Sequence, residues 1–159
     1  MYKPQSKMKL LVVVIFITII TGSLSCGEKA PCSCPDLSDY FFNPGNTLYS
    51  KGEGCVANVT CFSNLEETFT TARWNETEIP EPTDSDNYLL FVDSGSQGVP
   101  VNLYTLHGYV CEDGVWYATK YSTYGVTYYR KTELGAIELN GNFDGSKSKI
   151  DRIYCGKWP

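Results

Sequence analysis

The chain has 159 residues, the length of one ordinary domain, and a formal net charge of −5. An acidic surface repels phosphate groups, so this charge argues against nucleic acids and anionic membranes as partners. The chain has seven cysteines and a single histidine. The cysteines therefore suggest disulfide bonds, whereas one histidine gives little support for histidine-based catalysis.

The first residues have the pattern of a secretory signal peptide. Three lysines and no acid occupy residues 1–9, an apolar run, LLVVVIFITII, follows at 10–20, and the small-residue stretch TGSLSCG comes next. The alternative is a membrane anchor, but a helix needs about 20 apolar residues to span a bilayer. We therefore expect a signal peptide at residues 1–25, with cleavage as late as residue 27. The mature protein is then secreted and extracellular, has no membrane attachment, and its formal charge changes from −5 to about −8.

The cleavage site decides whether Cys26 remains in the mature chain. Cleavage after residue 27 leaves six cysteines, whereas cleavage after residue 25 leaves an odd thiol that can pair with another molecule. Secretion favours disulfides for the other cysteines. A zinc site at Cys32-Ser-Cys34 is the alternative, but zinc ligands are usually separated by two or more residues and often include histidine.

The rest of the chain has the pattern of β-structure. No stretch after residue 27 keeps a helical apolar period for three turns, and short runs rich in Thr, Val, Tyr and Ile are separated by glycines and prolines. We expect an all-β fold, a small disulfide-stapled antiparallel sandwich or sheet with long loops, in a single secreted domain at 28–159. The predicted strands lie at 47–50, 56–62, 68–74, 88–92, 101–110, 115–121, 126–130, 136–139 and 150–155.

An acidic segment at 75–86, NETEIPEPTDSD, separates a cysteine-rich part from a tyrosine-rich part. Its five acids and two prolines predict an exposed loop or linker. One domain is the preferred interpretation, since neither part is large enough to bury much core by itself. Asn58-Val-Thr60 and Asn75-Glu-Thr77 are acceptor sequons, so we expect glycans on Asn58 and Asn75.

The stretch YVCEDGVWYA at 109–118 predicts a tight hairpin. Asp113-Gly114 is a strong two-residue turn, because both positions require positive φ. Counting outward from the turn places Cys111 opposite Trp116, on the more apolar face of the hairpin. We therefore expect a buried Trp116 that covers a disulfide bond of Cys111.

The sequence also suggests how the cysteines pair. We expect Cys111 to bond with Cys155, which closes a loop worth about 4 kcal/mol in chain-entropy models. Along a straight strand Cys55 and Cys61 would lie about 20 Å apart, whereas bonded Cα atoms are about 4.4–6.8 Å apart. Unless the chain turns between them, these two must pair elsewhere, and we expect cross-pairs among four cysteines. Those four are Cys32, Cys34, Cys55 and Cys61.

These motifs resemble a secreted nematode domain family of unknown function. The segments that carry the resemblance are 32–35, 54–61, 110–117 and 153–155. It covers most of residues 32–155 and implies a domain of about six cysteines that follows a signal peptide. The 38-residue gap between Trp116 and Cys155 is longer than that family's compact ending. A weaker resemblance is to the sushi module of complement and adhesion proteins, which also ends in Cys, Gly-x-Trp and Cys.

No catalytic residue and no cofactor site can be assigned. We expect His107 to be an ordinary surface or hairpin residue, because a triad requires a base, an acid and a nucleophile in contact. The Gly-x-Ser-x-Gly, phosphate-loop and dinucleotide patterns do not occur in the sequence. The segment 140–151 echoes a calcium loop, but Asn140 and Asp151 are poor matches at its first and twelfth positions. We expect a plain Asn/Asp/Gly turn there and no metal.

The best candidate for a binding surface is a cluster of tyrosines. Tyrosine offers a large contact area and a hydroxyl at low entropic cost, which suits it to interfaces. The alternative is that the tyrosines simply fill strands. The cluster, which we expect to form an exposed patch, consists of Tyr117, Tyr121, Tyr124, Tyr128 and Tyr129.

The sequence therefore favours a secreted extracellular binding domain. Its partner would be an extracellular protein or glycan of unknown identity, bound without a cofactor. The alternatives are a structural or cuticle-associated extracellular protein and, less favoured, a secreted hydrolase. A tyrosine-lined exposed patch would indicate the binding domain, and a pocket that joins His107 to two carboxylates would indicate the hydrolase.

Overall fold

A computed structural model of the chain describes residues 30–61, 68–93, 100–121, 126–131 and 135–156. Residues Pro31–Pro159 form one compact unit. The predicted signal peptide, both cleavage positions, Cys26 and the start of the predicted domain at residue 28 lie outside the described residues.

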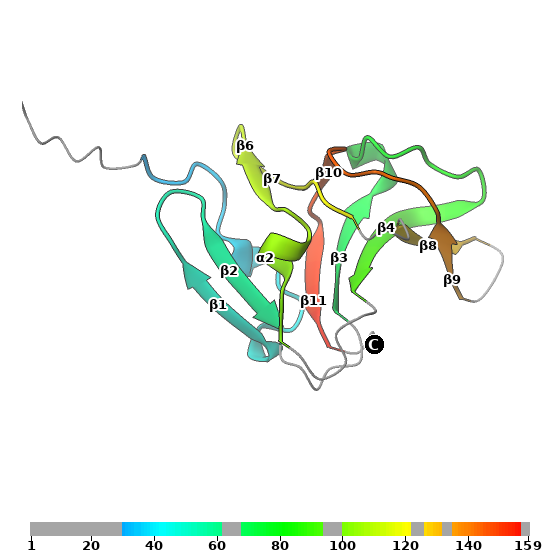
Figure 1. The fold of residues 1–159 in the computed structure, drawn as a ribbon. Coiled ribbons are helices and arrows are strands. Elements are labelled where there is room, and N and C mark those ends of the chain that lie inside the picture. The colour runs from blue at the N-terminus through cyan, green and yellow to red at the C-terminus, as the bar shows by residue number, and fades with distance from the viewer. Residues whose placement is uncertain (1–29, 62–67, 94–99, 122–125, 132–134, 157–159) are drawn as a thin grey trace, which may run out of the picture. The chain divides into compact units, whose positions relative to one another are not determined.

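The described strands form three antiparallel sheets, which confirms the all-β prediction (Figure 1). The five-stranded sheet has the order β11-β3-β4-β8-β9, and the other two have the orders β1-β2-β5 and β10-β7-β6. The strands are β1 (Thr47–Lys51), β2 (Ala57–Cys61), β3 (Thr68–Arg73), β4 (Ser85–Asp93), β5 (Val101–Asn102), β6 (Val110–Glu112), β7 (Val115–Ala118), β8 (Val126–Arg130), β9 (Ala136–Leu139), β10 (Ser148–Lys149) and β11 (Arg152–Cys155). The helical turns are α2 (Leu103–Leu106) and the 3-10 turns Leu37–Tyr40, Pro44–Asn46 and Trp74–Glu76.

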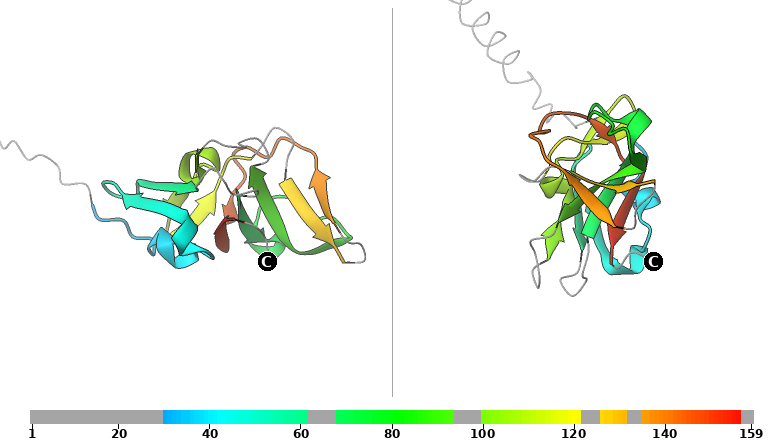
Figure 2. Two further views of the ribbon diagram at one scale, coloured as in Figure 1. Left: turned by 90° about the horizontal axis from the view of Figure 1, so that it is seen from below. Right: turned by 90° about the vertical axis from the view of Figure 1, so that its right-hand side faces the viewer.

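The five-stranded sheet has apolar side chains on both faces. Its order can be followed in Figure 2 (left) from red β11 through green β3 and β4 to yellow β8 and orange β9. Along β11, Ile153 joins the main core while Tyr154 joins a smaller cluster with Phe69 and Leu90, as the two-residue period of a strand requires. We call the face that carries Phe69, Leu90 and Tyr154 the outer face.

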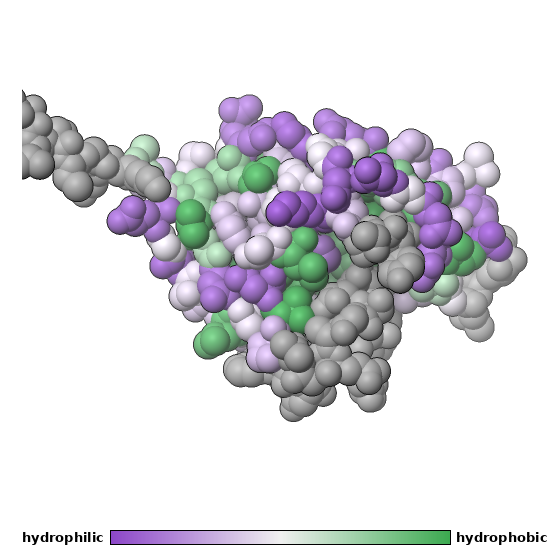
Figure 3. Space-filling view, in the orientation of Figure 1, coloured by the Kyte–Doolittle hydropathy of each residue, from purple (hydrophilic) through white to green (hydrophobic). Residues whose placement is uncertain are grey.

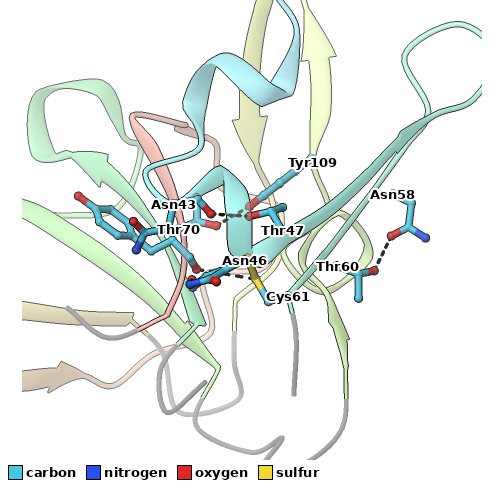
Figure 4. Close-up of a disulfide and its surroundings, with 10 residues drawn as sticks. Asn43, Asn46, Thr47, Asn58, Thr60, Cys61, Thr70 and Tyr109 are labelled. Carbon is cyan, nitrogen blue, oxygen red and sulfur yellow. Dashed lines mark hydrogen bonds between the residues drawn. A yellow bond between two sulfur atoms is a disulfide. The ribbon is translucent and has the colours of Figure 1, made fainter. Parts of the chain in front are cut away.

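The main core draws on all parts of the fold. Val59 of β2, Leu89 of β4 and Leu103 of α2 are fully buried. Tyr109 is buried among them, and its hydroxyl forms a hydrogen bond with Thr70 Oγ1 of β3 (Figure 4). The bond satisfies two polar groups that would be costly to bury unpaired, and it ties the segment before β6 to the large sheet.

The β6–β7 hairpin confirms the predicted register. Asp113 and Gly114 have φ angles of 50° and 78°, and Cys111 lies opposite Trp116. Trp116 is only 3 % exposed, and its Nε1 donates a hydrogen bond of 2.7 Å to the carbonyl of Pro35. The indole therefore holds the chain next to Cys34 against the hairpin.

The disulfide bonds differ from the predicted pairing. The structure contains Cys32–Cys55, Cys34–Cys111 and Cys61–Cys155, so the predicted Cys111–Cys155 bond is wrong and the predicted cross-pairing is right only for Cys32 with Cys55. The reason is the position of β11. Cys155 lies opposite Thr68 at the start of β3, and the chain reaches Thr68 shortly after Cys61 at the end of β2. Figure 4 shows this bond beside Asn46, whose Nδ2 donates to the Cys155 carbonyl at 3.2 Å.

The predicted strand at 101–110 is wrong in its middle, where α2 interrupts it. Asn102 caps this turn, because its Oδ1 accepts a hydrogen bond of 3.4 Å from the Thr105 N–H. Leu103 anchors the turn in the core. The predicted strands at 126–130 and 136–139 are confirmed as β8 and β9, and the other predicted strands occur with shifted ends. The last of them, predicted at 150–155, is β11, and the short strand β10 before it was not predicted.

The acidic segment at 75–86 is packed more closely than an exposed loop or linker. Ile79 is only 3 % exposed, and the buried Ser85 hydroxyl donates to Glu81 Oε1 at 2.9 Å. Thr77 forms a bridge to Ser148 at the edge of β10. The segment is therefore a fixed part of the compact unit, although most of its acids face solvent.

Candidate functional site

A groove crosses the outer face of the five-stranded sheet. Its volume is about 320 Å³, near the lower end of the range for ligand pockets. Alternate residues of the strands line this groove, because every second residue of a strand points to the same face of the sheet. The lining residues are Thr71, Arg73, Asp86, Tyr88, Leu90, Tyr129, Asp151, Arg152 and Tyr154. We call this site the outer groove.

Two contacts orient Arg73 in the outer groove. Its Nε donates to Asp151 Oδ1 at 3.3 Å, and its guanidinium lies 5.5 Å from the centroid of the Tyr88 ring, within the range of a cation–π contact. The arginine side chain is 51 % exposed, so the ion pair adds little to stability. Its effect is to hold a planar set of donors beside an aromatic ring.

Aromatic rings form the apolar part of the site. Tyr154 stands between Phe42 and Phe69, with ring centroids 4.7 and 4.5 Å away. Burial raises the pKa of the Tyr154 hydroxyl, so this group stays protonated at neutral pH. Tyr88, which lines the groove, is 38 % exposed, whereas the exposed Phe42 lies outside the lining. The groove thus offers the accessible ring of Tyr88 and the half-buried ring of Tyr129 beside the buried ring of Tyr154.

The charges of the outer groove balance. Arg73 and Arg152 face Asp86 and Asp151 in one lining, so the site carries no net charge at neutral pH. Arg152 and Asp86 are exposed. A groove of this kind suits a ligand that is polar and uncharged, because a charged ligand would meet repulsion as well as attraction.

Exposed apolar side chains elsewhere do not gather into one patch on the visible face. Figure 3 shows hydrophobic residues in separate areas, divided by hydrophilic ones, over the β1–β2 hairpin and α2. Leu48, Val56 and Leu106 are among the exposed large apolar residues of the described part of the chain. Single exposed apolar residues are normal on protein surfaces, so the outer groove remains the better candidate.

The structure does not assemble the predicted tyrosine patch. Tyr121 and Tyr128 are only 9 % and 5 % exposed, so their predicted exposure is wrong, and they belong to the main core. Tyr117 lines a different hollow, beside Glu112, whereas Tyr129 lines the outer groove. Tyr124 lies outside the described residues. The reason is the alternation of strands: neighbouring tyrosines along β8 point to opposite faces.

His107 and the 140–151 turn contribute to the fold. His107 is 2 % exposed and ends α2, so the expectation of a surface or hairpin histidine is wrong. Asp144 Oδ1 accepts a hydrogen bond of 2.8 Å from the Tyr121 N–H, and Asn142 Oδ1 accepts one of 3.3 Å from the Asp144 N–H. These oxygens shape a turn, as plain Asn/Asp/Gly turns do.

Both sequon asparagines, Asn58 and Asn75, are exposed. Asn58 Oδ1 accepts a hydrogen bond of 2.5 Å from Thr60 Oγ1, the hydroxyl of its own sequon (Figure 4). Glycosylation at these positions stays a prediction, and their exposure leaves room for it.

Sequence reasoning missed most of the outer groove. It singled out Tyr129 but not Arg73, Tyr88 or Tyr154, because the lining comes from separate strands whose order in the sheet the sequence does not reveal. The available signal was alternation: Tyr88 and Leu90 lie two residues apart, as do Arg152 and Tyr154.

The family model described as TRA-1 regulated protein R03H10.4 matches residues 30–155. The chain belongs to this family. The match agrees with the resemblance to a nematode domain family, and the sushi resemblance stays a prediction. No curated protein and no solved structure matches the chain. Among the described residues, no helix has the length and apolar character that crossing a membrane would require.

Proposed function

We infer that this protein is a secreted extracellular binding domain and that the outer groove holds a neutral saccharide unit of a glycan. One observation carries the proposal. The accessible ring of Tyr88, the half-buried ring of Tyr129 and balanced Arg and Asp side chains line one groove on the five-stranded sheet. Sites built on strands hold their side chains more firmly than sites on loops.

The chemistry of the groove matches that of a sugar ring. Such a ring has a face of C–H groups, which packs on aromatic rings, and an edge of hydroxyl groups, which bond to planar donors and acceptors. Tyr88 supplies the ring face, and Arg73 with Asp151 supplies fixed donors and acceptors beside it. A protein partner would usually cover about 800 Å² of each surface, which is far more than this groove offers.

Two features support secretion. The three disulfides suit an oxidising compartment. The exposed sequon residues Asn58 and Asn75 suit a chain that passes the glycosylation machinery. Both features accord with the signal pattern at residues 1–25.

The test begins with expression of the full chain in eukaryotic cells. We expect a protein in the medium that lacks at least its first 25 residues and loses mass on enzymatic deglycosylation. The secreted protein is then applied to an array of neutral oligosaccharides. We expect binding that falls at least about tenfold in Tyr88→Ala and in Arg152→Ala, as loss of about 1.4 kcal/mol implies.

Leu48→Ala is the matched control, because Leu48 is exposed on β1 and does not line the groove. It should leave binding unchanged. Equal binding by the wild type and both groove variants would contradict the proposal. Binding to no array member would favour a structural extracellular role instead.

A further inference from the structure

Two of the three disulfides lie side by side. Cys32–Cys55 joins the N-terminal segment to the turn before β2, and Cys34–Cys111 joins it to β6. The Sγ atoms of Cys32, Cys55 and Cys111 all lie within 4.8 Å of one another. The Cys111 sulfur of one bond is therefore close to both sulfurs of the other bond.

The Cys32-Ser-Cys34 spacing brings this about. Both cysteines are bonded to hairpins, and the Ser33 hydroxyl between them lies 3.6 Å from Cys111 Sγ, so three successive side chains face the hairpins. The Trp116 indole holds the segment in place through its hydrogen bond to the Pro35 carbonyl.

The two adjacent bonds are also open to solvent. Cys32, Cys55 and Cys111 are half-buried, and Cys32, Cys34 and Cys55 line a hollow of about 350 Å³. The third bond is different, because Cys61 and Cys155 are 1 % and 0 % exposed. A small thiol can therefore reach the adjacent pair but not the buried bond, and access is a main determinant of exchange.

We propose that Cys32, Cys34, Cys55 and Cys111 form one thiol-exchange site, in which a small-molecule thiol makes the two bonds swap partners. The thiolate attacks Cys34 Sγ and forms a mixed disulfide, and the electron pair of the broken bond leaves on Cys111. The Cys111 thiolate attacks Cys32 Sγ, which releases Cys55 as a thiolate. Cys55 attacks Cys34 Sγ and expels the small thiol.

The exchange balances without an oxidant or a reductant. Two disulfide bonds are present before and after it, and the entering thiol leaves unchanged. The product pairs are Cys32–Cys111 and Cys34–Cys55, so Cys32 and Cys34 exchange their places at the two hairpins. The exchange thus remodels the hollow that this segment lines. The site is independent of the outer groove.

A single substitution tests the central step. Cys34→Ser leaves Cys111 as a free thiol next to the Cys32–Cys55 bond. After incubation at pH 8.5 and alkylation, we expect molecules in which Cys111 is bonded to Cys32 or Cys55, identified by mass spectrometry of linked peptides. The rate should rise with pH, because the thiolate is the attacking species. Cys111 as the only alkylated cysteine would overturn the proposal.

Cys61→Ser is the matched control. It leaves the Cys155 thiol, which is buried and outside the sulfur group, so the other two bonds should keep their native pairing. The wild-type protein provides a test that does not depend on how a variant folds. With reduced glutathione at pH 8.5, we expect Cys32–Cys111 and Cys34–Cys55 pairs to form while Cys61–Cys155 persists. Retention of the native pairs alone, or earlier opening of Cys61–Cys155, would overturn the proposal.

Discussion

Tyr121 shows how the environment of one residue decides its role. Its hydroxyl donates to the carbonyls of Ala118 and Ser146 at 3.1 and 3.0 Å and lies 2.8 Å from Ser148 Oγ. A tyrosine close to lysine and arginine in the sequence suggests a binding surface. The partners that make it a core residue come from β7, from β10 and from the chain before β10, and no local sequence pattern predicts these contacts.

Alkaline pH should destabilise the protein through Tyr121. Burial raises the pKa of Tyr121 to about 12, whereas an unfolded tyrosine has a pKa near 10. Between these values the unfolded chain binds fewer protons, so the free energy of unfolding is constant below about pH 10 and falls toward pH 12. Denaturant titrations across this range should show the fall, and Tyr121→Phe should reduce it. Tyr109, whose pKa is also raised by burial, leaves part of the fall in place.

Tyr121→Phe should also lower the free energy of unfolding at pH 8, by about 1–3 kcal/mol, because buried partners lose their hydrogen bonds. Tyr117→Phe is the control, since it removes a hydroxyl from a half-buried ring of β7. It should change stability by no more than about 0.5 kcal/mol. If the free energy of unfolding of Tyr121→Phe fell between about pH 10 and 12 as much as that of the wild type, Tyr121 would not be a cause of the alkaline destabilisation.

The elements that could be predicted are those fixed by neighbours in sequence. The β6–β7 hairpin follows from Asp113-Gly114, since a two-residue turn with positive φ sets the register of both strands. The turn α2 could not be predicted, because a single helical turn has no period to detect. It depends on the Asn102 cap and on the burial of Leu103 against β2, and the latter is a tertiary contact.

The hairpin yields a prediction about Trp116. Trp116→Ala should lower the free energy of unfolding by about 3–5 kcal/mol, because it removes a large core ring. Trp116→Phe should cost less, since a ring remains and only the bond to Pro35 and some volume are lost. Denaturant unfolding of the secreted variants measures both.

A double-mutant cycle with Cys34→Ala/Cys111→Ala should reveal coupling of about 0.5–3 kcal/mol. The indole lies opposite Cys111 and bonds to the residue after Cys34, so ring and disulfide hold the same segment. Additive effects would show that the ring does not support this bond.

At the scale of the whole molecule, the order of the strands in each sheet is the feature that could not be predicted from the sequence. The correct strands leave many sheet orders open, and the order β11-β3-β4-β8-β9 creates both the outer groove and the Cys61–Cys155 bond. Because β11 pairs with β3, Cys155 lies next to Cys61 and not next to Cys111 of the β6–β7 hairpin, with which it was predicted to bond. The predicted cysteine pairing was wrong for the same reason that the groove was not predicted, because both depend on contacts between segments that are distant in sequence.

The Cys61–Cys155 bond should contribute more to stability than Cys32–Cys55 does. It spans 94 residues, against 23 for Cys32–Cys55, and chain-entropy models assign about 4–5 kcal/mol to the longer loop and about 3 kcal/mol to the shorter. Its sulfurs are also buried, so their removal leaves a cavity. Cys61→Ala/Cys155→Ala should therefore lower the unfolding midpoint and the secreted yield more than Cys32→Ala/Cys55→Ala does. Since a domain of this size is stable by only about 5–15 kcal/mol, a variant secreted at wild-type yield with an unchanged midpoint would show that sheet pairing alone closes this part of the fold.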